Sequence, residues 1–207
     1  EIDSKIMAAN PKDLEQVVTS AETLSWIGST KRNLGDLQGS DKTFEMLNKS
    51  LLPLHEQEFS ARSSFTLAAN MVHQSLTKAN LGEIANARKL NSDAISILTK
   101  LTEQDPQNAD WQRTFINAKY NLLSLIPHAE WKTENSADLK QFMGKLVGLL
   151  KQDPTNRNYI QTLVNLEREQ ALRALYAGDV VSAMTFAQSA FNRTMNELKK
   201  SPALPDN

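Results

Sequence analysis

The sequence predicts an all-α protein made of repeated helical hairpins. Two segments repeat almost literally, EQDPQNADWQ at 103–112 and KQDPTNRNYI at 151–160. Three others share a glycine followed by an acidic residue, NLGDLQG at 33–39, NLGEIAN at 80–86 and YAGDVVS at 176–182. Only seven Gly, seven Pro and 6% aromatic residues are present. This composition leaves little material for the many tight turns of a β-sandwich or barrel, so the repeated segments are expected to connect helices.

The Asp-Pro segments are predicted to join one hairpin to the next. Proline disfavours α geometry in the residue before it and suits the first turn of a following helix. Asp105 and Asp153 lie 48 residues apart, and a weaker version of the joint, ANPKDLEQ at 9–16, opens the first unit. The chain is therefore expected to repeat with a period close to 48 residues.

The Gly-acid segments are predicted to be the turns inside the hairpins. Glycine commonly ends a helix because it adopts the left-handed conformation without penalty, and the acidic residue behind it can cap the next helix. Counting from each glycine gives two columns in which small residues dominate, Ser40, Ala87 and Ala183 in one and Leu47, Ala94 and Ala190 in the other. The third unit, which has no such glycine, offers Ala137 and Gly144 in equivalent places. Residues three and four apart share one helix face. The first helix of each hairpin is therefore expected to pack closely on this face of the second.

Four hairpins follow in order from these signals, and together they are predicted to form a single helical repeat domain over residues 1–201, with a frayed tail at 202–207. In the third hairpin, which lacks the glycine turn, Pro127 is expected to end the first helix and Asn135 or Ser136 to cap the second. The paired helices are predicted at 12–36 and 40–60, 63–82 and 86–104, 108–126 and 136–151, and 156–177 and 180–199.

The pattern resembles the tetratricopeptide repeat family, in which small residues recur at fixed positions around a Gly-Asp turn. The matching residues are Gly28, Gly35 and Ser40 in unit one, Ser75, Gly82, Ala87 and Ala94 in unit two, and Ala171, Gly178, Ala183 and Ala190 in unit four. The period of 46 to 50 residues exceeds the 34 of the standard repeat. The DPxN joint followed by Trp111 is similar to degenerate repeats of large bacterial signalling and regulatory proteins.

The resemblance implies a right-handed α-solenoid whose first helices line a concave groove that binds a peptide or protein segment. Carrying over the groove positions of the family, residue by residue, assigns the partner-binding groove to Trp26, Ser29, Arg32, Asn33, His73, Asn80, Lys119, Arg168 and Tyr176. Arginine and asparagine on such a face can bind a peptide backbone or a terminal carboxylate. The expected function is a non-enzymatic interaction and regulatory scaffold.

No catalytic or metal-binding pattern competes with this interpretation. His55, His73 and His128 fall in different units, and none has a second histidine at helical spacing, so the zinc pattern HExxH is absent. Phosphate-binding loops and the Gly-x-Ser-x-Gly elbow are also absent. The carboxylate pairs sit two residues apart and are predicted to lie on solvated helix faces: Glu56 and Glu58, and Glu167 and Glu169. No enzyme activity, metal or cofactor is expected.

Net charge and hydropathy argue against nucleic acid and membranes as partners. The formal net charge is −1 and the pI is about 6.4, which supplies no electrostatic reason to bind nucleic acid or an anionic membrane. The apolar runs are far too short to insert into a membrane. Trp111 is predicted to seal the contact between hairpins and Trp131 to pack rather than to contact a partner, although exposed aromatic residues also anchor partners.

Two other functions stay open at this point. In a small-ligand sensor coupled to an output domain, Trp26, His73 and Asn80 would line the ligand pocket. In a self-assembly domain, the exposed end of the last unit, with Phe186, Phe191 and Met195, would pair copies into a homo-oligomer. Numbering from Glu1 rather than Met suggests an excised fragment or a processed product. The family resemblance implies that the chain is part of a larger bacterial protein. A cytoplasmic location is favoured, with the periplasm as the alternative.

Overall fold

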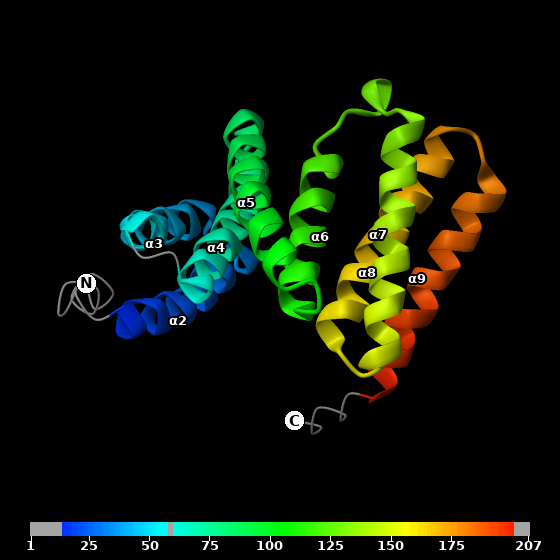
Figure 1. Ribbon diagram of the computed structural model, residues 1–207. Coiled ribbons are helices and arrows are strands. Elements are labelled where there is room, and N and C mark those ends of the chain that lie inside the picture. Colours follow the sequence, from blue (N-terminus) through cyan, green and yellow to red (C-terminus); the bar gives the residue numbers. More distant parts are fainter. Residues whose placement is uncertain (1–13, 58–59, 201–207) are drawn as a thin grey trace, which may run out of the picture. The chain divides into compact units, whose positions relative to one another are not determined.

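The computed structural model describes residues 14–57 and 60–200, and in these ranges it confirms the all-α prediction (Figure 1). No strand occurs in the described ranges, and the helices pack in consecutive pairs. In chain order the elements are α2 (Leu14–Asn33), α3 (Leu37–Gln57), α4 (Ala61–Asn80), α5 (Ile84–Gln104), α6 (Ala109–Ser124), the 3-10 turn η1 (His128–Glu130), α7 (Thr133–Gln152), α8 (Arg157–Tyr176) and α9 (Val180–Lys200).

The helix boundaries match the predicted ones to within three residues.

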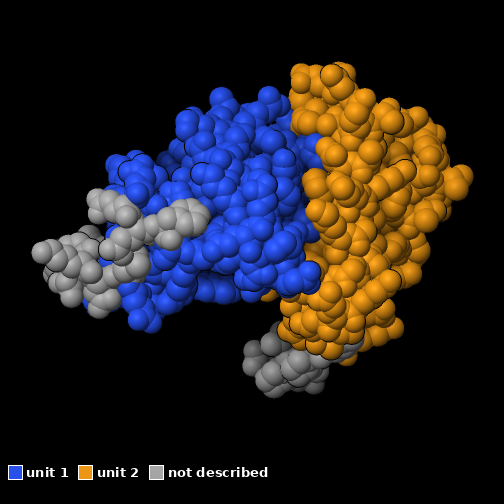
Figure 2. Space-filling model, viewed as in Figure 1, with its two compact units in different colours: residues 1–125 blue, residues 126–207 orange. Residues whose placement is uncertain are grey.

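The chain divides into two compact units, residues 1–125 and 126–207, coloured separately in Figure 2. The division falls inside the third predicted hairpin, so α6 belongs to unit 1 and α7 to unit 2. The prediction of a frayed tail at 202–207 concerns residues outside the described ranges.

The three Gly-acid turns have the predicted geometry. Gly35, Gly82 and Gly178 have φ angles of 86°, 79° and 78°, in the left-handed region that favours glycine. At each turn the glycine N–H donates to the carbonyl three residues back and the next N–H to the carbonyl five residues back, which is the Schellman arrangement. Asp36 and Asp179 then cap the following helices by accepting from Gly39 N and Ser182 N. Glu83, at the third turn, makes no side-chain capping bond to α5, so the predicted capping role of the acidic residue is confirmed at two of the three turns.

A glycine-to-alanine pair tests this assignment. Gly82→Ala places a Cβ in open space, so the expected loss of about 1 kcal/mol comes from the left-handed backbone alone. Gly144→Ala, inside α7 and equally unobstructed, is expected to gain about 0.5–1 kcal/mol through helix propensity. Thermal unfolding of both variants shows whether each substitution lowers or raises stability. A Gly82→Ala protein as stable as wild type contradicts the turn assignment.

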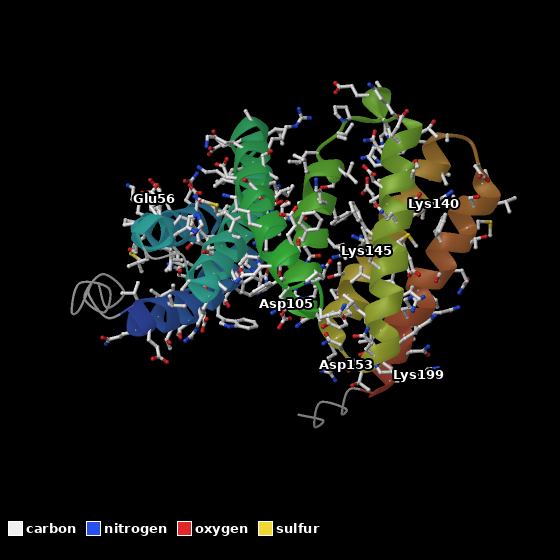
Figure 3. The ribbon with its side chains drawn as sticks, in the orientation of Figure 1. Glu56, Asp105, Lys140, Lys145, Asp153 and Lys199 are labelled. Atoms are coloured by element: carbon white, nitrogen blue, oxygen red, sulfur yellow. The ribbon has the colours of Figure 1, made fainter. Side chains whose placement is uncertain are left out.

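The two Asp-Pro joints are confirmed as helix boundaries. Asp105 and Asp153 are the C-cap residues of α5 and α7 and are labelled in Figure 3. Three residues later, Asn108 and Asn156 cap α6 and α8, with side-chain oxygens that accept from backbone N–H groups of the first turn. Each repeated DPxN sequence therefore ends one helix and starts the next.

The core of unit 1 forms where successive hairpins meet. Besides the contacts between helices adjacent in the chain, α2 packs against α4, and α4 packs against α6. The fully buried side chains of this core include Phe44, Leu47, Leu67, Leu98 and Leu101. Trp111 is partly buried against the same core, as predicted. The first helices of the three hairpins thus lie next to one another, which is the solenoid arrangement within this unit.

The small-residue columns are confirmed in three hairpins and wrong in the third. Of the predicted positions in α3, α5 and α9, all are buried: Ser40, Leu47, Ala87, Ala94, Ala183 and Ala190. In α7, however, Ala137 and Gly144 are exposed, and the buried residues are Leu139, Phe142 and Leu146. The third hairpin has no glycine from which to count, so its register was assigned by spacing alone, and a small shift rotates a helical position out of the core.

The connection before α7 also differs from the prediction. Helix α6 ends at Ser124, two residues before the predicted end, and α7 begins at Thr133 rather than at 136. Asn135 lies inside the first turn, where its side-chain oxygen accepts from the N–H of Lys132 at a distance of 2.8 Å. The predicted capping residue therefore acts from within the helix and lets the helix start earlier.

Candidate functional site

The predicted groove residues are divided between the two units. In unit 1, Trp26, Ser29, Arg32 and Asn33 lie on α2, His73 and Asn80 on α4, and Lys119 on α6. In unit 2, Arg168 and Tyr176 lie on α8. These seven residues of α2, α4 and α6 are called the first-helix face of unit 1, and they are the candidate site.

Arg32 connects two helices of this face. Its Nη1 donates to the backbone carbonyl of His73, 3.0 Å away and 41 positions along the chain. The same carbonyl accepts from the Oγ1 of Thr77 at 3.3 Å. The guanidinium is partly buried, and this burial lowers the pKa of Arg32. This hydrogen bond links α2 to α4 and brings together two residues that were assigned to the groove.

The His73 ring lies in an apolar and positively charged environment. It stacks on Phe44, with ring centroids 5.9 Å apart and planes 16° apart. Burial, together with the nearby charges of Arg32 and Arg113, lowers the pKa of His73 to about 4. Its Nδ1 is buried and has no hydrogen-bond partner in the described part of the chain. At neutral pH the ring is therefore uncharged and carries an unused polar atom.

Arg113 is a site residue that the sequence analysis missed. It lies on α6, close enough to His73 to affect its pKa, and its Nε is buried without a partner among the described residues. Its Nη2 lies 3.8 Å from Asp110, one turn earlier. Because the third hairpin has no glycine turn, its groove positions could not be assigned by counting from a glycine. Counting forward from the joint at Asp105 would have reached Arg113.

The other predicted residues of unit 1 are mostly exposed. Trp26, Asn33 and Asn80 are exposed, and Ser29 is half-buried. The ammonium group of Lys119 lies over the ring of Phe115, 5.5 Å from its centroid. An exposed indole and two exposed amides are suited to contacts with a bound chain, since both groups combine apolar area with hydrogen-bonding capacity.

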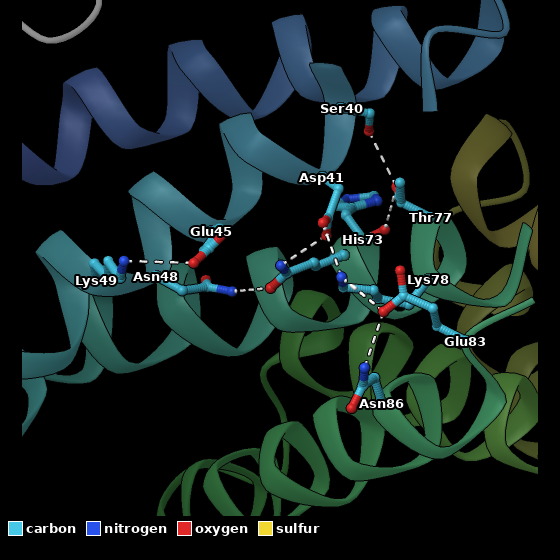
Figure 4. A network of polar contacts seen from close by, with 11 residues as sticks. Ser40, Asp41, Glu45, Asn48, Lys49, His73, Thr77, Lys78, Glu83 and Asn86 are labelled. Atoms are coloured by element: carbon cyan, nitrogen blue, oxygen red, sulfur yellow. Dashed lines mark hydrogen bonds and ion pairs between the residues drawn. The ribbon is translucent and has the colours of Figure 1, made fainter. Parts of the chain in front are cut away.

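A polar network between α3 and α4 continues from the His73 carbonyl through Thr77 (Figure 4). Lys78 forms ion pairs with Asp41 at 2.8 Å and with Glu83 at 2.9 Å. Gln74 donates to Asp41 and accepts from Asn48, while Ser40 shares a hydrogen bond with Thr77. The groups are largely satisfied by one another, so the network holds the hairpins in register rather than offering a free binding site.

The expectation that Glu167 and Glu169 lie on a solvated face is wrong. Both are buried. Glu169 pairs with Arg173 at 2.7 Å, and Glu167 accepts from Ser189 at 2.8 Å and from Arg193 at 2.9 Å. A spacing of two residues separates the side chains around the helix but does not prevent each from meeting its own cation. Glu56 is exposed as predicted, and Glu58 lies outside the described residues.

Arg173 organises the segment before α7 within unit 2. Its guanidinium lies 3.9 Å from the centroid of the Trp131 ring and donates to the carbonyl of Ile126 and to His128. Trp131 Nε1 donates to Ser136. The packing role predicted for Trp131 is therefore confirmed. Of the two predicted groove residues on α8, Arg168 is exposed, and the Tyr176 ring contacts the ring of His128.

Other kinds of site find little support in the described ranges. No group of three or more His, Cys, Asp or Glu side chains in them could hold a metal ion. None of the helices described is both long and apolar enough to cross a membrane. A pocket of about 270 Å³ in unit 2 is lined by Leu150, Pro154, Ile160, Arg193, Asn196 and Glu197. The arginine in this pocket is already bound to Glu167.

The fold defines the chain as an all-α protein of consecutively packed helical hairpins. No family of known proteins matches its sequence, and no curated protein does so either. Among solved structures, the crystal structure of BtubC (BKLC) from P. vanneervenii is similar, with a TM-score of 0.52 and 10% sequence identity over 99% of this chain and 91% of that one. At this identity the similarity concerns the fold alone.

Proposed function

We propose that the protein is a non-enzymatic peptide-binding domain of tetratricopeptide type, acting as a regulatory region of a larger bacterial protein. The first-helix face of unit 1 would bind a segment that presents a carboxylate, either a chain terminus or an acidic side chain. The observation that carries the proposal is the pair of arginines beside His73. Arg32 has no carboxylate at salt-bridge distance among the described residues, and Arg113 keeps a buried Nε unpaired.

The electrostatics of the cluster favour an anionic ligand. A partly buried guanidinium loses hydration, and a carboxylate that reaches it restores charge-assisted hydrogen bonds. Because the His73 ring is neutral above its lowered pKa, the two arginines supply the positive charge. The exposed Trp26, Asn33 and Asn80 would add a stacking surface and amide contacts to the backbone of the ligand.

A display library of peptides with free C-termini tests the proposal. Selected peptides are resynthesised with free and with amidated termini, and their Kd values are measured by fluorescence polarisation. We expect Arg32→Gln and Arg113→Gln each to weaken binding at least tenfold, which corresponds to about 1.4 kcal/mol. Lys49→Gln is the matched control, since this exposed lysine pairs with Glu45 on α3, away from the cluster.

Two results would count against the proposal. Selected peptides that bind the Arg32→Gln and Arg113→Gln proteins as tightly as wild type would remove the arginine cluster from the site. Peptides without any carboxylate that bind as well as acidic ones would remove the charge argument. In either case circular dichroism of the variants must match wild type, so that lost binding is not lost folding.

A further inference from the structure

The interfaces between hairpins in unit 1 define which face of a second helix receives the next hairpin. On α3 this face carries Asp41, Asn48 and His55, spaced seven residues apart. Their partners all lie on α4: Lys78 and Gln74 for Asp41, Gln74 for Asn48, and Ser64 for His55. On α5 the residue equivalent to Asp41 is Arg88, which donates to the carbonyl of Leu125 at the end of α6.

The same face of α9 is apolar and exposed. Counting from Gly178 as from Gly35, Met184, Phe191 and Leu198 occupy the positions of Asp41, Asn48 and His55. Their exposed fractions are 68%, 58% and 60%. With Val181 and Met195 they form the α9 stripe, whose positions around Gln188 follow the alternating spacing of three and four residues found along coiled-coil seams. Phe186, which the sequence analysis grouped with Phe191 and Met195, is half-buried instead.

The exposed residues of α9 beside the α9 stripe carry no charge up to Leu198. Between residues 180 and 198 every exposed residue is uncharged. The two charged residues of this stretch, Arg193 and Glu197, are half-buried and lie near residues of α8. Arg193 binds Glu167, and Glu197 lies 3.9 Å from Arg157. The nearest exposed charges along the chain are Asp179, before α9, and Lys199, labelled near the end of α9 in Figure 3. In a chain with 23% charged residues, this is a long neutral face.

We propose that the α9 stripe pairs with the α9 stripe of a second copy of this chain, forming an isologous dimer. A two-fold interface brings the same surface together from both copies, so it must complement itself. A neutral apolar stripe with coiled-coil spacing meets this condition, because no charge faces its own equivalent. A following helix with polar residues like those of α4 that bind α3 would find no hydrogen-bond partners among the apolar side chains of the stripe.

Two other occupants fit the observations less well. A head-to-tail contact between α9 and the α2 helix of another copy joins two different surfaces, so it does not require the stripe to complement itself, and it produces open-ended assemblies. An anionic membrane surface selects amphipathic helices with lysine and arginine on the polar face, and the exposed flanks of the stripe have none before Lys199.

Replacing Gln188 tests the proposal, because the effect on association is expected only if two stripes pair. It occupies the middle of the stripe, is exposed, and donates to Asn192 on its own helix. A polar residue in a seam lowers the stability of the pair while restricting its register. In a dimer through the stripe, Gln188→Leu should therefore tighten association, about tenfold in Kd, whereas in a monomer it merely exposes another apolar residue.

Sedimentation velocity of the full chain over a range of concentrations tests the proposal. We expect a reversible monomer–dimer equilibrium that Met184→Glu/Phe191→Glu abolishes and Gln188→Leu strengthens. Leu34→Glu, an apolar-to-acidic change at another exposed site, should leave the equilibrium unchanged. Since the chain has no cysteine, Gln188→Cys should form a disulfide-linked dimer under mild oxidation.

The proposal is overturned by a protein that stays monomeric at all concentrations, or by a dimer that survives Met184→Glu/Phe191→Glu. Oligomers that grow with concentration without stopping at two would indicate head-to-tail association instead. A Gln188→Leu protein with an unchanged Kd would place the interface elsewhere. Circular dichroism of the dimerisation variants must match that of wild type, so that lost association is not lost folding.

Discussion

Replacing Lys78 by Met is expected to lower the free energy of unfolding by about 2–3 kcal/mol. Lys78 and Asp41 are 17% and 12% exposed, so removal of the ammonium group leaves a largely buried carboxylate with Gln74 as its remaining partner. Truncating one member of a buried ion pair is damaging mainly because the other member stays uncompensated. Urea unfolding followed by circular dichroism measures the change.

Two comparisons separate this effect from general loss of surface charge. Lys89→Met removes an ion pair with Asp93 whose side chains are 75% and 45% exposed, and it is expected to change stability by less than about 0.5 kcal/mol. Replacing both Lys78 and Asp41 by apolar residues should restore part of the loss, since no buried charge remains. Equal effects of Lys78→Met and Lys89→Met would show that the network in Figure 4 contributes nothing specific.

The second large effect is a loss of stability in acid through His73. The pKa of His73 is lowered to about 4 in the folded protein, from an ordinary value of 6.5, chiefly by burial. Between these two values the unfolded chain binds a proton that the folded protein does not bind. Stability is therefore complete above about pH 6.5 and falls as the pH drops toward 4, by up to about 3 kcal/mol.

The His73→Gln protein is the control for this pH dependence. Glutamine cannot titrate, so the free energy of unfolding of the variant should fall less between pH 6.5 and 4, whatever its value at neutral pH. Other groups that titrate in acid contribute equally to both proteins, so the difference between the two curves isolates His73. Parallel curves would mean that the ring is protonated as easily in the folded as in the unfolded chain.

Local chemistry explains which parts of the fold were predictable. Gly35, Gly82 and Gly178 each predict a turn, because the turn requires a residue in the left-handed conformation. The capping asparagines Asn108 and Asn156 follow from the repeated joints. Where the local signal was missing, in the third hairpin, the register was lost. Ala137 and Gly144 were then assigned to a packed face on which they do not lie.

The candidate site was predictable only in part, because it depends on contacts between distant segments. Arg32 and His73 were both assigned to the groove, and they meet across 41 positions of sequence. Arg113 came from the hairpin without a turn marker and was missed. The burial of Glu167 depended on Arg193, 26 positions later on α9, which spacing along one helix could not reveal.

The consecutive pairing of helices also bears on how the chain folds. Apart from α2 with α4 and α4 with α6, the main contacts within each unit join helices that are neighbours in sequence. Such a topology has a low contact order, because each hairpin closes a short turn before any distant segment is needed. Folding of unit 1 can then begin at any of its tight turns and extend hairpin by hairpin, without a search for one obligatory long-range nucleus.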